Sequence, residues 1–167
     1  MKEKLIKIVK SYFDGEMDGD TWHYEMPREN IFTGGINLQC KVGSVKYAVA
    51  VSDDLVQCYH IAPIKAEEAQ RAEMAEFITR ANYDTKLGNF EMDFRDGELR
   101  YKMVISSNDL LGDKEAALKS MNILMILGVR QWEQYGDNIA AVALGFTNGK
   151  SIEELVAESE NQVAKSN

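Results

Sequence analysis

The chain has 167 residues, a formal net charge of −8 and an estimated pI of 4.8. Binding to phosphate groups requires clustered Lys and Arg, so this acidic balance argues against nucleic acid or an anionic membrane surface as a partner. The charge would instead attract a basic segment of another protein. A hydrophobic fraction of 45% and a charged fraction of 28% are typical of one ordinary globular domain.

The two cysteines and the N-terminus indicate the compartment. Cys40 and Cys58 are too few for a disulfide framework. Residues 1–7 carry charges where a signal peptide needs an apolar run, and the longest apolar stretch, near residues 123–129, is too short to span a bilayer. We therefore expect a cytoplasmic protein.

The N-terminal half predicts a helix followed by strands. Residues 2–13 form an amphipathic pattern whose apolar face comprises Leu5, Ile6, Ile8, Val9, Tyr12 and Phe13. Alternating apolar and polar residues then predict four antiparallel strands, over roughly residues 22–26, 32–42, 45–51 and 55–61. We expect Gly34-Gly35 to mark a bulge or break in the second strand, and Pro63 to end the fourth.

The middle of the chain predicts a second helix and a β-hairpin. Residues 66–83 read as a helix with the stripe Met74, Phe77, Ile78 and Ala81. Residues 86–106 read as a hairpin in which Asp96-Gly97 is a two-residue type I′ loop. That loop pairs the apolar residues Phe94–Leu99, Met92–Tyr101 and Phe90–Met103, and the charged residues Arg95–Glu98, Asp93–Arg100 and Glu91–Lys102.

The C-terminal third predicts helices. Asp113 is the expected N-cap of a long helix that is apolar nearly all round over residues 117–129, which indicates burial on more than one side. We expect Gly128 to bend or divide this helix. One face of its later part would carry Trp132, Tyr135, Ile139, Val142, Ala143 and Phe146. Ser151 and Glu154 form a capping box that starts a last helix through about Val163.

These elements predict an α+β fold, an antiparallel sheet covered by helices in the order α-ββββ-α-ββ-α-α. We expect residues 1–147 to form a single α+β domain. Residues 148–167 would form a C-terminal capping helix that is packed on this domain or appended to it.

An acidic stretch matches part of a calcium-binding motif. An EF-hand loop needs oxygen ligands at positions one, three and five, glycine at six and glutamate at twelve. The corresponding residues are Asp14, Glu16, Asp18, Gly19 and Glu25, with Asp20 at the seventh position. A strand pattern and Pro27 follow where the second helix of an EF-hand belongs. An acidic turn is the simpler interpretation, with a calcium-binding module as the alternative.

Motifs of enzymes and zinc sites are weak. His23, His60, Cys40 and Cys58 are four potential zinc ligands, and Cys58 and His60 share a strand face. No close Cys-x-x-Cys pair accompanies them, so we expect two core cysteines and two partly exposed histidines. Because nucleophile and phosphate-loop motifs are also missing, we expect no enzyme, catalytic residue, cofactor or metal. An active site assembled from scattered residues stays open.

The long C-terminal helix carries more apolar surface than one small sheet needs. Its residues Met121, Met125, Trp132 and Tyr135, with Phe146, are of types enriched where proteins bind proteins. The helix is therefore either the main core helix or an interaction surface, and self-association would satisfy both interpretations.

Several segments resemble the YbjN-like family, often labelled bacterial sensory transduction regulators, which is similar in fold to type III secretion chaperones. The matching segments are Ile78–Tyr83, Leu87–Glu91, Asp96–Tyr101, Tyr135–Phe146 and Gly149–Leu155. The resemblance implies helices on an antiparallel sheet, a chain that is commonly dimeric, and no established catalytic residues. The strand pattern at residues 55–61 is additional to the simplest secretion-chaperone layout.

We therefore expect a non-enzymatic protein-interaction domain, chaperone-like or regulatory, that forms a homodimer. It would offer an apolar sheet or helix face to a protein or peptide partner, by strand addition or groove binding. The alternatives are a calcium-binding module that uses the acidic loop 14–25 and an unrecognised enzyme.

Overall fold

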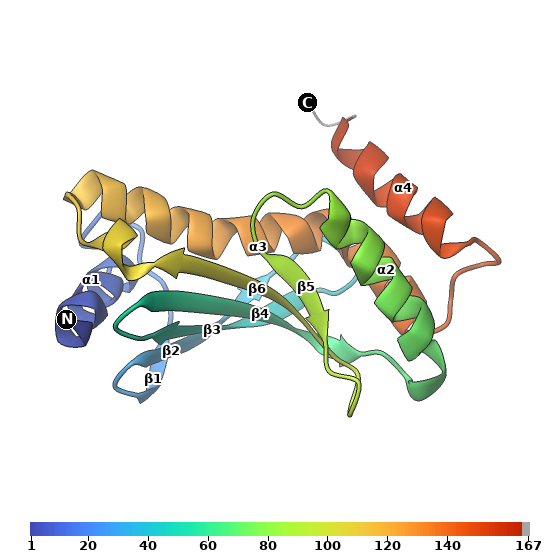
Figure 1. Ribbon diagram of the computed structural model, residues 1–167, viewed down its shortest axis with the longest axis horizontal. Helices are drawn as coiled ribbons and strands as arrows, with labels where there is room; N and C mark the ends of the chain where they lie inside the picture. Colours follow the sequence, from blue (N-terminus) through green and yellow to red (C-terminus); the bar gives the residue numbers. More distant parts are fainter. Residues whose placement is uncertain (165–167) are drawn as a thin grey trace.

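The computed structural model describes residues 1–164 and confirms the α+β order (Figure 1). The strands form one antiparallel sheet in the order β1-β2-β3-β4-β6-β5. They are β1 (Glu25–Arg28), β2 (Ile31–Asn37), β3 (Ser44–Val51), β4 (Leu55–Lys65), β5 (Asn89–Met92) and β6 (Glu98–Ser106). The helices are α1 (Lys2–Phe13), α2 (Arg71–Tyr83), α3 (Lys114–Ala143) and α4 (Ile152–Ala164), with short 3-10 turns η1 (Glu68–Gln70) and η2 (Ser107–Leu110).

The core lies between the sheet and α3. Figure 1 shows α3 running along one face of the sheet, with α1 near its N-terminal end and α2 and α4 near its C-terminal end. Burial alternates along β4, where Val56, Cys58, His60 and Ala62 face α3. The alternation follows from the two-residue period of a strand, which sends successive side chains to opposite faces. Within residues 1–164 we find no helix whose apolar length suffices to cross a bilayer.

The long helix α3 is continuous over its 30 residues. Asp113 caps it as predicted, because its carboxylate accepts a hydrogen bond of 2.8 Å from the Ala116 N–H. The helix is not divided at Gly128, which was one of the two outcomes expected there. A Cβ added at Gly128 would lie 2.3 Å from Nδ1 of His60, so the glycine allows the ring of His60 to approach the helix.

The register of the β5–β6 hairpin differs from the prediction by two residues. Phe90 pairs with Tyr101 and Met92 pairs with Leu99. The shift is even, so Phe90, Leu99 and Tyr101 still face the core, as the alternation predicted. Phe94, which was expected opposite Leu99, is instead 62% exposed in the loop.

The loop itself explains the shift. It contains residues 94–97 instead of the predicted two, and only Gly97 in it has a positive φ, at 77°. Asp93 accepts a hydrogen bond of 2.9 Å from the Arg95 N–H, and the Gly97 N–H donates to the Asp93 carbonyl at 2.7 Å. The carbonyl of Gly97 accepts a hydrogen bond of 2.9 Å from the Ala66 N–H, which fixes the loop against a distant segment.

Two expectations about strand ends and breaks are wrong. The pairing of β2 with β3 is regular through Gly34 and Gly35, with no bulge. A Cβ at Gly34 would lie 2.4 Å from Oη of Tyr47, so this glycine makes room for a ring. Strand β4 continues past Pro63, and the irregularity lies in its pairing with β6 beyond Ile61.

Strand β2 ends at Asn37, earlier than predicted, because α3 supplies other acceptors to the loop that follows. The N–H groups of Gln39 and Lys41 donate to the carboxylates of Glu133 and Asp137 at 2.6 and 2.7 Å. The first strand is also shorter than the alternation suggested. It begins at Glu25, and the side chains of Trp22 and Tyr24 pack on Phe13 of α1.

The C-terminal segment packs against α2 and α3. The predicted capping box is present, with Ser151 N–H to Glu154 at 2.8 Å and Glu154 N–H to Ser151 Oγ at 3.2 Å. Asn138 of α3 donates to the Leu155 carbonyl at 2.9 Å. Helix α3 ends at Ala143, so Phe146 lies beyond it and is 70% exposed rather than on its buried face. Residues 165–167, the end of the expected capping segment, lie outside the described part.

Candidate interaction surface on the outer face of α3

Helix α3 carries two apolar stripes. The inner stripe faces the sheet and is buried; it includes Ala117, Met121, Leu124, Met125, Trp132, Tyr135 and Ile139. The outer stripe consists of Leu118, Ile123, Ile126 and Leu127, which are half-buried or exposed. We expected residues 117–129 to be buried on more than one side. Within the described protomer only the side that faces the sheet is fully buried.

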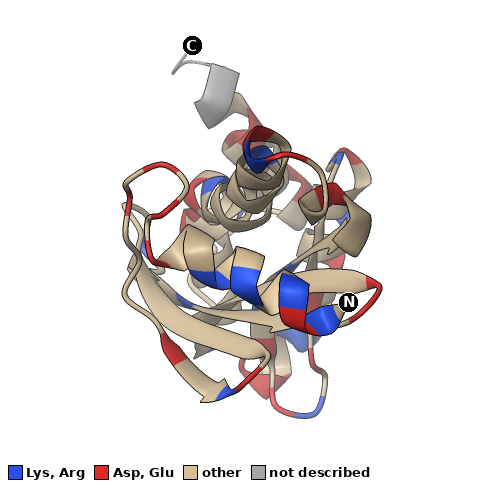
Figure 2. Ribbon diagram, turned by 90° about the vertical axis from the view of Figure 1, so that its left-hand side faces the viewer, with Lys and Arg blue, Asp and Glu red and all other residues tan. Residues whose placement is uncertain are grey.

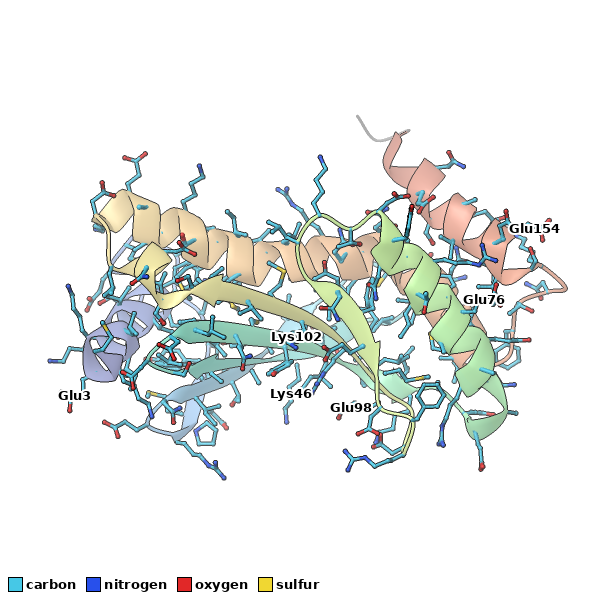
Figure 3. All side chains as sticks on the ribbon, in the orientation of Figure 1. Glu3, Lys46, Glu76, Glu98, Lys102 and Glu154 are labelled. Atoms are coloured by element: carbon cyan, nitrogen blue, oxygen red, sulfur yellow. The ribbon has the colours of Figure 1, made fainter. Side chains whose placement is uncertain are left out.

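The outer stripe is the floor of a groove of about 860 Å³. One wall includes Leu87, in the loop between α2 and β5, and the other includes Asp18 and Asp20, in the loop after α1. Figure 3 shows side chains of α3 projecting away from the sheet along this side of the helix. The groove is open, with an apolar floor and acidic side chains in one wall, and an apolar groove of this kind can accept an amphipathic helix.

Charged side chains surround the groove. Glu115 stands near one end of the outer stripe and Arg130 near the other, with Lys119 between them. None of the ion pairs formed by described residues involves Glu115, Lys119, Arg130 or the two wall aspartates. These charges are exposed, so they carry little cost in water and are available to a partner.

The edges of the sheet are poorly suited to strand addition. On β5, the side chain of Asn82 donates to the Phe90 carbonyl at 3.0 Å and accepts from the Phe90 N–H at 2.8 Å. These two bonds occupy the backbone groups that an added strand would use. At the other edge, β1 is short and contains Pro27, which lacks an N–H. The geometry therefore favours groove binding over strand addition.

The sheet face opposite α3 is partly covered by a network of charged side chains. The guanidinium of Arg100 stacks 4.5 Å from the ring centroid of Tyr59 and pairs with Glu91 at 2.7 Å. Glu91 also pairs with Lys102 at 3.3 Å. Burial opposes its ionisation, but hydrogen bonds from Arg100, Asn89 and Lys102 outweigh that effect and hold the pKa of Glu91 below its usual value.

A basic groove lies beside α1. Lys4, Lys7 and Lys114 line it together with Ile8, within a volume of about 500 Å³. Figure 2 shows the basic positions of α1 in blue along that helix. The carbonyl of Glu16 already accepts a hydrogen bond of 2.9 Å from Nζ of Lys114. Carboxylates also stand in its wall, so its charge is mixed and it is a weaker candidate than the groove on α3.

Cys58 and His60 come together, but in the core. The Cys58 Sγ lies 3.7 Å from Nδ1 of His60, whose Nε2–H donates to the Met125 carbonyl at 2.9 Å. Both side chains are fully buried, so the expectation of a partly exposed histidine is wrong for His60. Burial lowers the pKa of His60 to about 4 and raises the pKa of the Cys58 thiol. His60 is therefore neutral at pH 7 and joins β4 to α3.

The other proposed zinc ligands are remote from this pair. Cys40 is half-buried in the loop after β2, and His23 is exposed in the segment before β1. Among described residues no group of three or more His, Cys, Asp and Glu side chains is placed to hold a metal ion. The four side chains are thus not brought to one site.

The acidic residues of segment 14–25 are likewise not brought together. Asp14 pairs with Lys10 and accepts a hydrogen bond of 2.7 Å from the Tyr24 hydroxyl. Asp18 accepts from the Asp20 N–H at 3.1 Å, as in an ordinary acidic turn. Glu25 lies on β1, because the chain enters a strand after the loop instead of the helix of an EF-hand. The calcium alternative gains no support from this geometry.

The side chains that the sequence suggested for protein binding are mostly in the core. Met121, Met125, Trp132 and Tyr135 are buried, which confirms the core-helix interpretation, and only Phe146 is exposed. The outer stripe was not singled out from the sequence. Its signal is the spacing of Lys119, Ile123, Ile126 and Arg130, which places polar ends around an apolar centre on one helix face.

No family model, curated protein or solved structure matches this chain. The structure confirms the α+β architecture that the YbjN-like resemblance implies, and membership in that family stays a prediction.

Proposed function

We propose that this protein is a non-enzymatic interaction domain of the cytoplasm, chaperone-like or regulatory in role, that receives an amphipathic helix in the groove on α3. The observation that carries the proposal is the second apolar stripe of α3, whose Ile123 and Ile126 line the floor of an open groove while Leu118 and Leu127 also pack against the core. Apolar side chains gathered at helical spacing on a surface are stabilised when a partner removes them from water.

Two further features support this proposal. The bonds from Asn82 to the backbone of Phe90 favour the groove over strand addition as the binding mode. Thiol and imidazole groups are reactive, but the thiol of Cys58 and the imidazole of His60 are fully buried in the core, where a substrate cannot reach them. A homodimer, in which the same groove is used twice, is part of the proposal.

The test is a double variant in the groove. Ile123→Asp combined with Ile126→Asp places two carboxylates on the floor, so partners captured by the tagged wild-type chain from its own cells are expected to be lost. Val104→Asp is the matched control, because Val104 is 39% exposed on the opposite face of the sheet and Ile123 is 36% exposed. Far-UV circular dichroism and thermal melts of all variants verify the fold.

The outcome that contradicts the proposal is an identical set of captured partners for the wild-type chain and the folded double variant. Loss of partners in Val104→Asp alone would also contradict it, since that result would place the interaction on the open sheet face.

A further inference from the structure

We propose that a pocket between the α2–β5 loop, α3 and α4 binds an organic cation, an ammonium or guanidinium group on an alkyl stem. This inference goes beyond the proposed function, because the pocket is a separate hollow of about 440 Å³. Sites for small molecules have volumes of roughly 300–1,000 Å³. Figure 1 shows the α2–β5 loop crossing α3 beside the C-terminal end of α4.

Three segments that are far apart in the sequence supply the polar side chains of this pocket. Asp84 and Lys86 come from the α2–β5 loop, and Glu160 comes from α4. Gln131 and Tyr135 come from α3, where a spacing of four residues places them on the same side of the helix. The pocket therefore depends on the tertiary fold and not on one local motif.

Two carboxylates and a buried hydroxyl face the pocket. Tyr135 is only 4% exposed, and its hydroxyl donates to Oε1 of Glu160 at 3.5 Å. Burial, and after it the carboxylates of Glu160 and Asp84, raises the pKa of Tyr135 to about 12, so the hydroxyl keeps its proton at pH 7. Neither carboxylate takes part in the ion pairs formed by described residues. Their negative charge is thus available to a cationic ligand.

An unused hydrogen-bond acceptor lies in the same wall. Oε1 of Gln131 is buried and accepts no hydrogen bond from the described residues. Buried polar atoms almost always have a partner, so such an atom indicates a donor that the described chain does not supply. Ammonium and guanidinium groups carry several N–H donors and no acceptor, which matches a wall rich in acceptors.

The apolar part of the lining suits an alkyl stem. Leu87 is exposed and Leu127 is half-buried, and both border the pocket. The methylene groups of a basic ligand can pack on these side chains while its charged end reaches the polar atoms. Both leucines also line the groove on α3. The cation therefore has two sources, a free amine or a Lys or Arg side chain of a helix bound in the groove.

The lining favours an organic cation over a metal ion or an anion. Within the described part of the chain no group of three or more His, Cys, Asp and Glu side chains is placed to hold a metal ion, which would need several such ligands. Lys86 is the only cationic side chain of the described lining, and it is exposed. An anion would meet this one ammonium and two carboxylates, so its binding is opposed by the net charge.

The experiment is isothermal titration calorimetry in a phosphate buffer without other amines. Butylamine is the probe, and butan-1-ol and butyrate are the uncharged and anionic controls. We expect saturable binding of butylamine with a dissociation constant of about 1 mM or below, and no binding of the two controls. Asp84→Asn combined with Glu160→Gln retains the shape of the pocket and removes both charges. This double variant is expected to weaken the binding of butylamine by at least about tenfold.

Glu29→Gln is the matched control variant. Glu29 is an exposed carboxylate in the turn between β1 and β2, at the edge of the sheet far from β5, so its neutralisation should leave the affinity unchanged. Lys86→Gln removes the cation of the lining and is expected to leave the affinity for butylamine unchanged or to raise it. Circular dichroism of each variant establishes that the chain is folded.

A second probe distinguishes the two sources of the cation. Nα-acetyl-lysine amide carries the same butylammonium group on a peptide backbone. If it binds as tightly as butylamine, the pocket admits the side chain of a partner. If butylamine alone binds, the pocket is a site for a free amine.

Three results overturn the inference: no saturable binding of either amine to the wild-type chain, equal affinity in the Asp84→Asn and Glu160→Gln double variant, or tighter binding of butyrate than of butylamine. Loss of binding in Lys86→Gln or Glu29→Gln would overturn it as well. None of these results decides the proposed function, because the capture of partners by the groove is tested separately with the Ile123→Asp and Ile126→Asp double variant.

Discussion

The two faces of α3 are built from the same kinds of residue and have different environments. On the inner face Leu124 and Trp132 are fully buried, whereas Ile123, one residue before Leu124, is 36% exposed on the outer face. What separates the faces is a set of specific polar contacts. Nε1–H of Trp132 donates to the His60 carbonyl at 3.1 Å, and His60 donates to the Met125 carbonyl on the same helix.

These contacts show that hydrophobicity alone does not orient this helix. Either stripe is apolar enough to face a sheet, but only the inner one has a tryptophan N–H, a helix carbonyl and a glycine placed to receive β4. An unpaired buried donor is costly, so these groups fix the rotation of α3 about its axis. The charges beside the outer stripe are exposed and take part in none of the ion pairs formed by the described residues.

Removing the side chain of Trp132 from the inner face is expected to lower the free energy of unfolding most. Trp132→Ala removes a fully buried ring that packs against Phe90 at 5.2 Å between centroids, together with the bond to His60. We expect the free energy of unfolding to fall by about 3–5 kcal/mol. Urea denaturation followed by circular dichroism measures it. Trp132→Phe retains most of the volume and is expected to cost clearly less; a loss below about 1 kcal/mol for Trp132→Ala would show that the inner face is not the core.

The buried histidine makes the stability of the inner face depend on pH. The pKa of His60 is about 4 in the folded chain, against 6.5 in the unfolded chain. Between these values the unfolded state binds more protons, so the free energy of unfolding falls as the pH is lowered from 6.5 toward 4. The contribution of this one group is up to about 3 kcal/mol. It is fully present above pH 6.5.

Urea denaturation at several pH values measures this slope. His60→Gln is expected to flatten it while lowering stability at pH 7. His23→Gln is the matched control, since His23 is exposed and its removal should leave the slope unchanged. An unchanged slope in His60→Gln would mean that other groups cause the loss of stability in acid.

Much of the fold was predictable from local patterns. The order of helices and strands, the Asp113 cap and the Ser151 capping box follow from periodicity and short-range chemistry. The register of the β5–β6 hairpin was not predictable from local patterns, because Asp96-Gly97 alone indicates a two-residue loop. The actual loop depends on the hydrogen bond between Gly97 and Ala66, a contact between segments far apart in the sequence.

The candidate site was only partly predictable. The pattern over residues 117–129 indicated apolar side chains on more than one side of the helix, which is correct, but the helical period does not say which side meets the sheet. Gly128 was interpreted as a flexible point because its neighbour His60 lies in a strand 68 residues earlier. The rotation of α3 and the role of Gly128 both depend on contacts between α3 and β4, which a single sequence does not display.

Helix α4 marks where the exposed part of α3 ends. It packs on α2 and on the later part of α3, and Asn138 bonds to its Leu155 carbonyl. Ser151→Ala removes the capping hydroxyl and is expected to lower stability by about 1 kcal/mol, with faster hydrogen exchange confined to α4. Ser151→Asp retains an acceptor and should preserve most of the stability. Protection that is unchanged in Ser151→Ala would show that the contacts with α3 hold α4 without the cap.

A substitution on the outer stripe is expected to change the free energy of unfolding least. How that change depends on protein concentration distinguishes the outer face from the inner face. Ile126→Ser should change the free energy of unfolding of the dilute monomer by no more than about 0.5 kcal/mol, whereas Leu124→Ser on the inner face should cost several kcal/mol. If a second copy covers the stripe, the cost of Ile126→Ser grows as the protein concentration is raised, because only the wild-type chain gains stability from association. A large cost that is independent of concentration would place Ile126 in the core of the protomer, and the distinction between the two faces would fail.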